Sequence, residues 1–297
     1  MIKRTLYFGN PAYLKTKNEQ LVVELAETGE VKTAAIEDIG VLILDNQQIT
    51  ITQAVLAKLL ENNTAVITCN HTHHPVGLLL NLDGHTLQSQ RFKHQLSASA
   101  PLQKQLWQQT IMAKITNQAN LFSEKQLPYK PLLNLASKVK SGDSDNCEAQ
   151  AATYYWKHIF PEFLQFKRSR EGDPPNNLLN YGYAILRAIV ARSLVGSGLL
   201  PTLGIFHKNQ YNAYCLADDI MEPYRPYVDE VVYEIVEMNG TYLEMTPKMK
   251  QQLLSIPAMD VWIDGEKSPL MNAVQRTTAS LAKCFEGTTR KLRYPVL

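Results

Sequence analysis

NNLLNYGYAILRAIVARSLV, residues 176–195, is the stretch that decides how this chain folds. Its apolar residues recur with a period near 3.6 rather than 2, which predicts a long helix. The apolar region extends over residues 183–206, but Arg187, Arg192 and Pro201 interrupt it, so we do not expect a membrane span. The stretch predicts a soluble globular protein with a long apolar helix.

The same helical period dominates the chain on both sides of this stretch, as far back as Gly84. Further helices are expected at residues 102–122, 148–160 and 268–285. Exposed loops rich in polar residues and glycine separate these helices. Residues 86–297 are therefore predicted to form a large, all-helical domain.

The chain before residue 86 has a different character. It contains the short β-rich runs RTLYF, QLVVEL, IGVLIL and TAVITC, which turn-forming residues separate. One helix is expected among them at residues 52–63, with Thr52 as its cap. The fold class is thus predicted to be α+β: a small β-rich domain at residues 1–85, followed by the helical domain.

Composition gives no sign of a particular partner. The 30 basic and 28 acidic residues leave a formal charge of +2, so any nucleic-acid binding has to come from local clusters. Cys69, Cys147, Cys215 and Cys284 lie far apart, which argues against a zinc ribbon and against a disulfide framework. We expect buried thiols in a protein of the reducing cytoplasm.

The acidic stretch LADDIMEPYRP, residues 216–226, has two interpretations. In the first, Asp219 caps a helix and Glu222 completes a capping box, with both charges at the positive end of the helix dipole. In the second, Asp218, Asp219 and Glu222 share a helix face, and their mutual repulsion is offset by a bound cation. The stretch is therefore either the acidic head of a helix or half of a metal site.

A similar spacing occurs upstream, where Asp145 precedes Glu148 by three residues at the predicted start of another helix. Carboxylates near helix N-termini stay ionised at neutral pH, as a hard divalent cation requires of its ligands. His207, which follows the long apolar helix, is a third candidate ligand, although a lone histidine is more often a hydrogen-bonded structural residue. Two helix starts could direct Glu148 and Glu222 at one point.

Residues 174–232, from PPNNLL to VDEVV, resemble the core of the CRISPR-associated integrase, the Cas one family, in the form that accompanies type II systems. Residues 143–160, DSDNCEAQAATYYWKHIF, resemble the segment of that family that carries its upstream catalytic glutamate. The β-rich start followed by helices also fits the two-domain layout of the family. The resemblance covers nearly the whole chain.

This resemblance implies that Glu148, His207 and Glu222 are the catalytic and metal-binding residues, with Asp219 as an additional acidic position. Some members of the family carry aspartate where this chain has Glu222, whose longer side chain can still reach a metal. Carboxylates suit Mg²⁺, and an imidazole ligand is readily accepted by Mn²⁺, so we expect either cation. Zinc is disfavoured because no cysteine has a recognisable ligand spacing.

The resemblance further implies a DNA endonuclease and integrase of antiviral defence. The 3′-hydroxyl of captured double-stranded DNA would attack a CRISPR repeat in a transesterification. The implied partners are a second copy of the chain, bound largely through the β-rich domain, and a small adaptation protein of the Cas two family. Two alternatives are a non-catalytic DNA-binding scaffold and a metallohydrolase of small phosphoesters, although the chain lacks a glycine-rich phosphate loop.

Three further clusters each have a structural alternative. Lys167, Arg168 and Arg170 could bind DNA phosphates or form a solvated face. The C-terminal RKLRYPVL, residues 290–297, could hold a DNA backbone and stack a base on its tyrosine, or be a mobile tail. HTHHPVG, residues 71–77, resembles a metal-binding tract by composition, but its proline and glycine favour a turn.

Overall fold

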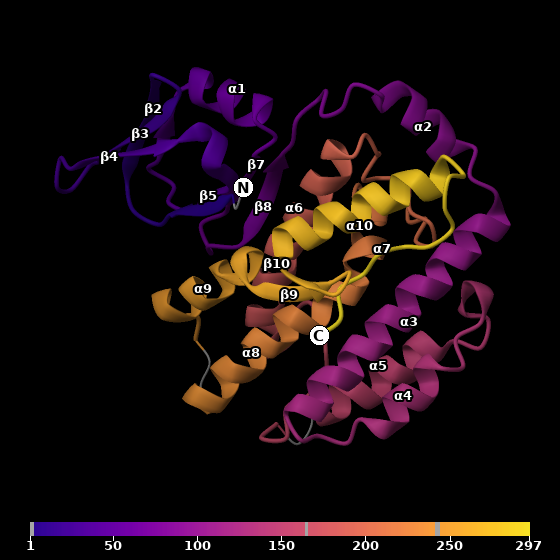
Figure 1. The fold of residues 1–297 in the computed structure, drawn as a ribbon. Helices are drawn as coiled ribbons and strands as arrows, with labels where there is room; N and C mark the ends of the chain where they lie inside the picture. The colour runs from indigo at the N-terminus through magenta and orange to yellow at the C-terminus, as the bar shows by residue number, and fades with distance from the viewer. Residues whose placement is uncertain (1–2, 164–165, 241–243) are drawn as a thin grey trace.

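The computed structural model describes residues 3–163, 166–240 and 244–297 (Figure 1). Its strands are β1 (Arg4–Phe8), β2 (Ala12–Lys17), β3 (Gln20–Leu25), β4 (Val31–Ala35), β5 (Ile39–Leu44), β6 (Thr50–Ile51), β7 (Ala65–Cys69), β8 (Pro75–Leu79), β9 (Asp260–Ile263) and β10 (Glu266–Pro269). Its α-helices are α1 (Gln53–Glu61), α2 (Gln88–Leu96), α3 (Ala100–Glu124), α4 (Lys130–Ala136), α5 (Cys147–His158), α6 (Asn176–Gly196), α7 (Cys215–Met221), α8 (Arg225–Asn239), α9 (Pro247–Leu254) and α10 (Leu270–Phe285). Short 3₁₀ turns are η1 (Ile36–Asp38), η2 (Ser141–Asp143), η3 (Glu222–Tyr224) and η4 (Ile256–Ala258).

The N-terminal part contains two four-stranded sheets. In the first, with the order β1-β5-β7-β8, the strands β1, β5 and β7 are parallel and β8 is antiparallel to β7. In the second, with the order β4-β3-β2-β6, only the β2–β6 pair is parallel. Figure 1 shows these strands gathered on one side of the molecule, with α3 on the opposite side. The predicted α+β class is confirmed, whereas the boundary between residues 85 and 86 stays a prediction.

The first sheet is buried on both faces, which explains why IGVLIL reads as a continuous apolar run. Along β5, Val41 and Ile43 belong to the core of the helical part, whereas Leu42 belongs to the core beneath α1 and the second sheet. Along β7, Ile67 belongs to the core of the helical part and Val66 to the core beneath α1 and the second sheet. Side chains alternate between the faces of a strand, so this sheet contributes one face to each of two separate cores and joins the two parts of the chain.

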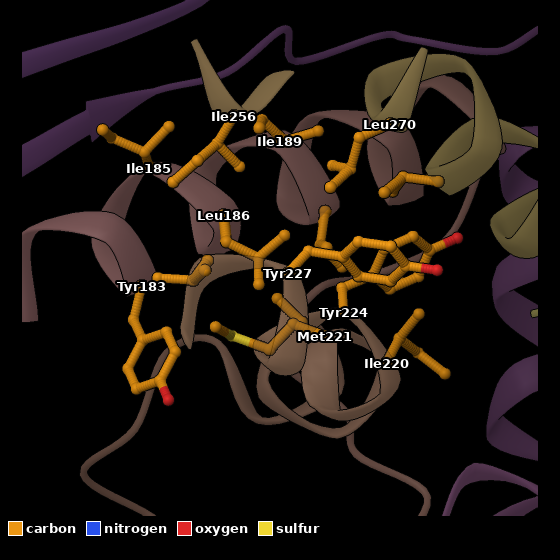
Figure 2. Packing of buried hydrophobic residues seen from close by; sticks show 14 of the residues in the cluster. Tyr183, Ile185, Leu186, Ile189, Ile220, Met221, Tyr224, Tyr227, Ile256 and Leu270 are labelled. Atoms are coloured by element: carbon orange, nitrogen blue, oxygen red, sulfur yellow. The ribbon is translucent and has the colours of Figure 1, made fainter. Parts of the chain in front are cut away.

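Helix α6 is the centre of the helical part, and its bounds confirm the helix predicted from residues 176–195. Figure 2 shows its residues Ile185, Leu186 and Ile189 packed among side chains of α7, α8, η4 and α10. By length and composition alone α6 could cross a membrane, but 83% of its most apolar window is buried inside the fold. The core helix of a globular protein can be equally long and apolar, and the packing of α6 against neighbouring helices accounts for its apolar surface.

The helices predicted at residues 102–122, 148–160 and 268–285 correspond to α3, α5 and α10. The expectation of an all-helical second part needs one correction, because β9 and β10 pair as an antiparallel hairpin at the turn formed by Asp264 and Gly265. Thr52 occupies the N-cap position of α1, but its side chain makes no capping hydrogen bond. All four cysteines are buried and unpaired, as predicted.

The C-terminal segment is packed against α3, so the mobile-tail interpretation is wrong. Tyr294 shares a hydrogen bond of 2.9 Å with Thr110, and Asn117 donates to the Pro295 carbonyl at 3.1 Å. The Leu297 amide donates to Asn117 at 3.2 Å. Because these contacts hold the tyrosine ring against the helical core, it is not free to stack on a base.

Candidate active site

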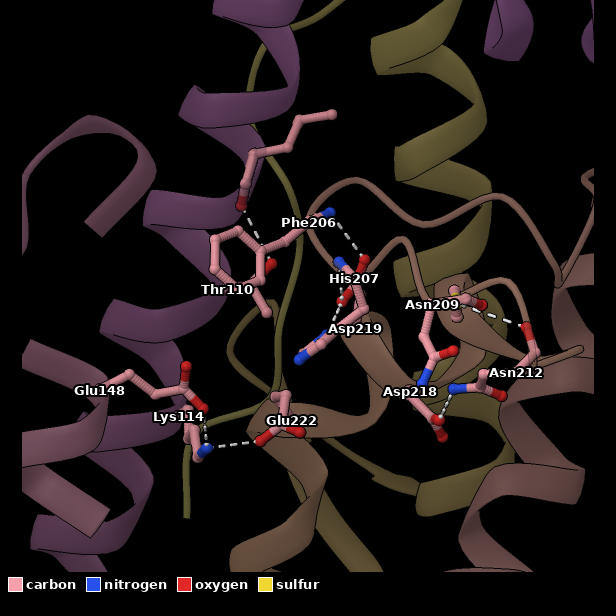
Figure 3. Close-up of polar contacts among 12 residues, drawn as sticks. Thr110, Lys114, Glu148, Phe206, His207, Asn209, Asn212, Asp218, Asp219 and Glu222 are labelled. Atoms are coloured by element: carbon pink, nitrogen blue, oxygen red, sulfur yellow. Dashed lines mark hydrogen bonds and ion pairs between the residues drawn. The ribbon is translucent and has the colours of Figure 1, made fainter. Parts of the chain in front are cut away.

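Lys114 of α3 lies between two carboxylates that are far apart in the chain. Its Nζ is 2.7 Å from Glu148 Oε1 on α5 and 2.6 Å from Glu222 Oε2 on η3 (Figure 3). The Lys114 side chain is only 10% exposed. The structure therefore brings Glu148 and Glu222 to one point, as the sequence predicted, and places a cation of the protein itself between them.

Glu148 lies in the first turn of α5, but the cap of this helix differs from the expected one. Asp143, not Asp145, accepts the amides of Cys147 at 2.9 Å and Glu148 at 3.0 Å. Asp145 instead forms an exposed ion pair with Lys140 at 2.7 Å. The capping carboxylate satisfies two amides of the first turn and fixes the start of the helix that carries Glu148.

Glu222 and Asp219 do not form a capping box, so that interpretation is wrong. Asp219 lies inside α7, and Glu222 begins the 3₁₀ turn η3 that leads into α8. Pro223, which cannot donate a backbone hydrogen bond, follows Glu222 at this change of helical geometry. Asn117 of α3 donates to the Pro223 carbonyl at 2.8 Å, so α3 anchors the turn beside the glutamate.

The charge of Glu222 is held by two cations. Arg225 Nε donates to Glu222 Oε1 at 2.8 Å, while Lys114 approaches Oε2. Burial alone would raise the pKa of Glu222, but the charges of Arg225 and Lys114 outweigh burial and lower the pKa to about 2. The pKa of Lys114 is raised, because Glu222 and Glu148 overcome the opposite effect of its burial. Glu222 and Lys114 are thus both ionised at neutral pH.

His207 lies in the loop after α6, and Asp219 fixes its orientation. Asp219 Oδ1 is 2.5 Å from His207 Nδ1 and also accepts the His207 amide at 3.3 Å, while Oδ2 accepts the Phe206 amide at 2.9 Å. The hydrogen bond to Asp219 raises the pKa of His207. Since Nδ1 is engaged, Nε2 is the ring nitrogen left for a ligand, an arrangement typical of metal-binding histidines.

The loop around His207 depends on close contacts. A Cβ on Gly204 would lie 2.4 Å from the His207 carbonyl oxygen and 2.7 Å from Asp219 Oδ2, so only glycine fits. Phe206 stacks on Trp107 of α3 with ring centroids 4.2 Å apart, and His207 meets the same indole edge-on at 5.6 Å. Buried Trp107 thereby places the imidazole close enough for Glu222 and Glu148 to influence its pKa.

The residues present fit a divalent cation, although they do not form a finished ligand cage. Within residues 3–163, 166–240 and 244–297, no three acidic, histidine or cysteine side chains are grouped closely enough to hold a metal as they stand. Glu222 Oε2 is nevertheless buried, and the Lys114 ammonium that meets it at 2.6 Å occupies the point that a cation would take between the two carboxylates. Two carboxylates and an oriented imidazole are donors that Mg²⁺ and Mn²⁺ accept.

The three basic side chains of the predicted DNA-binding cluster, Lys167, Arg168 and Arg170, have different surroundings. Lys167 and Arg170 are exposed. Arg168 is partly buried: its guanidinium donates to Asn176 at 2.9 Å and Asn180 at 2.7 Å and lies 5.3 Å from the centre of the Tyr183 ring. Arg168 therefore holds this loop against α6, whereas the other two remain available to solvent.

Some residues of the site could not be found in the sequence by motif. They share the task of holding the proposed ligands or their helices: Lys114, Asn117, Asp143 and Arg225. The histidines of residues 71–77 form no metal cluster with other described residues. Asn70 accepts the amides of Thr72 and His74 and organises the first part of this segment as a turn, whereas Pro75 and Gly77, on which the turn prediction rested, lie in β8. Only the folded chain shows which lone polar residues face the acidic pair.

The fold is that of Cas1 proteins. A solved Cas1 protein from Thermotoga maritima has a TM-score of 0.76 at 15% identity, with 96% of this chain and 97% of that chain covered. A casposase bound to its integration product has a TM-score of 0.79 at 19% identity, with 98% and 92% covered. The Cas6-RT-Cas1–Cas2 complex contains a chain with a TM-score of 0.74 at 20% identity, covering 97% of this chain and 35% of that one.

The sequence comparison gives the family. The profile described as CRISPR associated protein Cas1 matches residues 6–249. The CRISPR-associated endonuclease Cas1 of Neisseria meningitidis serogroup C (strain 8013) is 37% identical over 298 residues, covering 99% of this chain and 96% of the relative. The chain belongs to the Cas1 family of CRISPR-associated endonucleases.

Proposed function

We propose that this chain is a metal-dependent DNA integrase that joins the 3′-hydroxyl ends of captured double-stranded DNA to a CRISPR repeat. The observation that carries the proposal is the meeting of Glu148 and Glu222 on one cationic centre, Lys114, with His207 oriented nearby by Asp219. Family membership supports the same reaction class. The product of such a reaction is a new phosphodiester bond in antiviral adaptation.

Glu148, Glu222 and His207 Nε2 would hold Mg²⁺ or Mn²⁺, and Asp219 would keep the imidazole in the required tautomer. When bound, the cation supplies charge for the phosphoryl oxygens and lowers the pKa of an attacking hydroxyl. Lys114 has to leave its bridging position before both carboxylates can take part. Its ammonium neutralises the same two charges until then.

The choice between joining and hydrolysis would depend on positioning. We assign no described residue as a dedicated base for a water molecule, so the site has no fixed preference for water over a 3′-hydroxyl. A DNA end held in line with the reacting phosphate has a large effective concentration and would win. Transesterification conserves the number of phosphodiester bonds, and the joined product is therefore open to the reverse reaction.

The proposed partners are double-stranded DNA, a second copy of the chain and a small adaptation protein of the Cas2 family. The β-rich part would supply much of the contact between copies. The solved Cas1–Cas2 complex with the same fold supports the choice of the small partner. Four buried, unpaired cysteines support a cytoplasmic location.

The test of the reaction is an integration assay with supercoiled plasmid that carries a candidate repeat. One DNA fragment has a free 3′-hydroxyl and a matched fragment has a 3′-dideoxy end; both are supplied with the small partner, in Mn²⁺ or Mg²⁺ and in chelator. We expect joined product only with the free hydroxyl and a metal. Equal joining of both fragments, or nicked target alone under every condition, would replace the integrase with a plain nuclease.

The residues are tested in the same assay. Glu148→Ala, His207→Ala and Glu222→Ala should each abolish joining and keep DNA binding, because the three act as one unit. Asp145→Ala, which removes an exposed carboxylate near the start of the same helix as Glu148, is the matched control and should remain active. Full binding without activity in the wild type would favour a scaffold, and turnover of a phosphomonoester alone would favour a small-substrate hydrolase.

A further inference from the structure

Asp229 of α8 accepts hydrogen bonds from two other helices in the interior of the helical part. Its Oδ2 accepts the Tyr155 hydroxyl of α5 at 2.9 Å, and its Oδ1 accepts the Tyr183 hydroxyl of α6. All three side chains are buried. One carboxylate therefore ties α8 to α5 and to α6.

The Tyr155–Asp229 hydrogen bond is a second connection between the elements that carry the two glutamates. Tyr155 follows Glu148 by seven residues along α5. Asp229 follows Glu222 by seven residues along η3 and α8. Seven residues are about two helical turns, so each glutamate and its follower lie on the same side of their helix. The two elements are thus joined through Lys114 at one end and through this hydrogen bond about two turns further on.

The hydrogen bond from Tyr183 leads to Glu222 by another route. The Arg225 guanidinium lies 4.6 Å from the centre of the Tyr183 ring, and its Nε donates to Glu222 Oε1 at 2.8 Å. Because Asp229 holds the hydroxyl of that ring, it limits the positions that the ring and the guanidinium packed on it can take. Asp229 is therefore connected to both glutamates without touching either.

A buried carboxylate is an unfavourable means of stabilising a core. Burial raises the pKa of Asp229 to about 6, although the two tyrosine hydroxyls oppose the rise, so the group is ionised at neutral pH. Removing a charge from water costs free energy that apolar packing does not cost. A buried polar network whose hydrogen bonds are satisfied instead makes the structure rigid and specifies one geometry. The position of the helices, rather than stability, accounts for a charge at this point.

We propose that Asp229 is a positioning residue that keeps the two glutamates facing one point when Lys114 is displaced. The inference rests on the proposed function, in which a divalent cation takes the place of the ammonium. Once the ammonium has left, the connection at that end is lost and the two carboxylates repel each other. The hydrogen bond between Tyr155 and Asp229 does not involve Lys114 and remains. The spacing of the glutamates is therefore set before a divalent cation is bound.

Titration calorimetry with Mn²⁺ in the absence of DNA measures this role apart from any reaction. Asp229→Asn removes the charge with little change of shape, and Tyr155→Phe removes only the hydroxyl that reaches α8. Each should weaken Mn²⁺ binding about tenfold, as expected when a metal ligand loses the group that orients it. The double variant should bind Mn²⁺ no more weakly than Asp229→Asn, because the two groups act through one hydrogen bond.

The matched control on α5 is Tyr154→Phe, because the Tyr154 hydroxyl donates to the Pro128 carbonyl at 2.9 Å rather than to α8. This variant should bind Mn²⁺ as tightly as the wild type. In a Lys114→Met background, Asp229→Asn should still weaken binding, because the second connection does not depend on the ammonium. Glu222→Ala should abolish binding, which shows that the measured Mn²⁺ lies at the glutamates.

The joining assay separates positioning from a general defect of the fold. Asp229→Asn should need about tenfold more Mn²⁺ for half-maximal joining and recover most of the wild-type rate at saturation. A purely structural defect would lower the rate at every Mn²⁺ concentration. Circular dichroism and urea unfolding check that the variants are folded under the conditions of the assay.

Unchanged Mn²⁺ affinity in Asp229→Asn and Tyr155→Phe would overturn the positioning role, as would additive losses in the double variant or an equal loss in Tyr154→Phe. Weaker Mn²⁺ binding by the variants, together with a wild type that joins no DNA, would keep the positioning role and reject the integrase. Joining by the wild type, together with unchanged Mn²⁺ affinity in the variants, would do the opposite.

Discussion

Replacing Lys114 with methionine isolates the role of the cation between the two glutamates. Methionine keeps most of the buried side-chain volume and removes the ammonium that lies 2.7 Å from Glu148 and 2.6 Å from Glu222. Without a divalent cation, the two carboxylates lose their shared counter-charge. We therefore expect the variant to be destabilised in chelator.

The size of the expected loss in stability depends on the partners and the solvent contact that each carboxylate retains without Lys114. Breaking a buried ion pair costs about 3–5 kcal/mol. Glu222 retains Arg225, and the Glu148 side chain is 25% exposed, so the lower end applies, about 3 kcal/mol. For a chain of this length a change of 1 kcal/mol shifts the Tm by about 2 °C, which gives a loss of about 6 °C.

Thermal unfolding with chelator and with Mn²⁺ measures this loss and its recovery. A bound cation takes over the neutralising role of Lys114, so saturating Mn²⁺ should stabilise the variant more than the wild type. Titration calorimetry should show tighter Mn²⁺ binding by the variant, because no ammonium has to be displaced. Lys125→Met is the matched control, since Lys125 pairs with Glu234 at 3.1 Å at the end of the same helix. If the variant lost the same Tm with and without Mn²⁺, the idea that Mn²⁺ and the Lys114 ammonium occupy the same position would be refuted.

Three further predictions test the surroundings of the site. Asp219→Asn should weaken Mn²⁺ binding about 10- to 100-fold by releasing the His207 ring, which calorimetry measures; unchanged affinity would show that the orientation is immaterial. Gly204→Ala should displace the His207 loop and lower joining activity while far-UV circular dichroism is unchanged, because its Cβ would lie 2.4 Å from a carbonyl oxygen. Burial raises the pKa of Asp229 from 3.8 to about 6, so between pH 4 and 6 the folded state holds this proton more tightly than the unfolded state. The free energy of unfolding of the wild type should therefore fall by about 3 kcal/mol as the pH rises from 4 to 6, whereas that of Asp229→Asn should not show this fall. Urea unfolding at a series of pH values measures both, and the same pH dependence in the two proteins would contradict the shift.

Local patterns predicted the elements well where one periodicity dominates. Residues 176–195 gave α6 to within a residue, because a long apolar helix in the core keeps the period of its own backbone. The β9–β10 hairpin was missed, since its two strands are only four residues each and alternate over too short a distance. The prediction of a capping box at residues 219–222 was wrong because the two carboxylates accept hydrogen bonds from the Phe206 amide and from Arg225 rather than from the first turn of a helix.

The sequence by itself determined the α+β order of the chain and the identity of the acidic and histidine residues in the candidate site. These follow from local periodicity and from a resemblance that covers the motifs. Only the tertiary structure decided that Lys114 lies between Glu148 and Glu222, and that Asp219 binds His207. The reason is physical: a lysine within a long helix has no local signature of its role, and its energy depends on charges that distant helices bring close when the core forms.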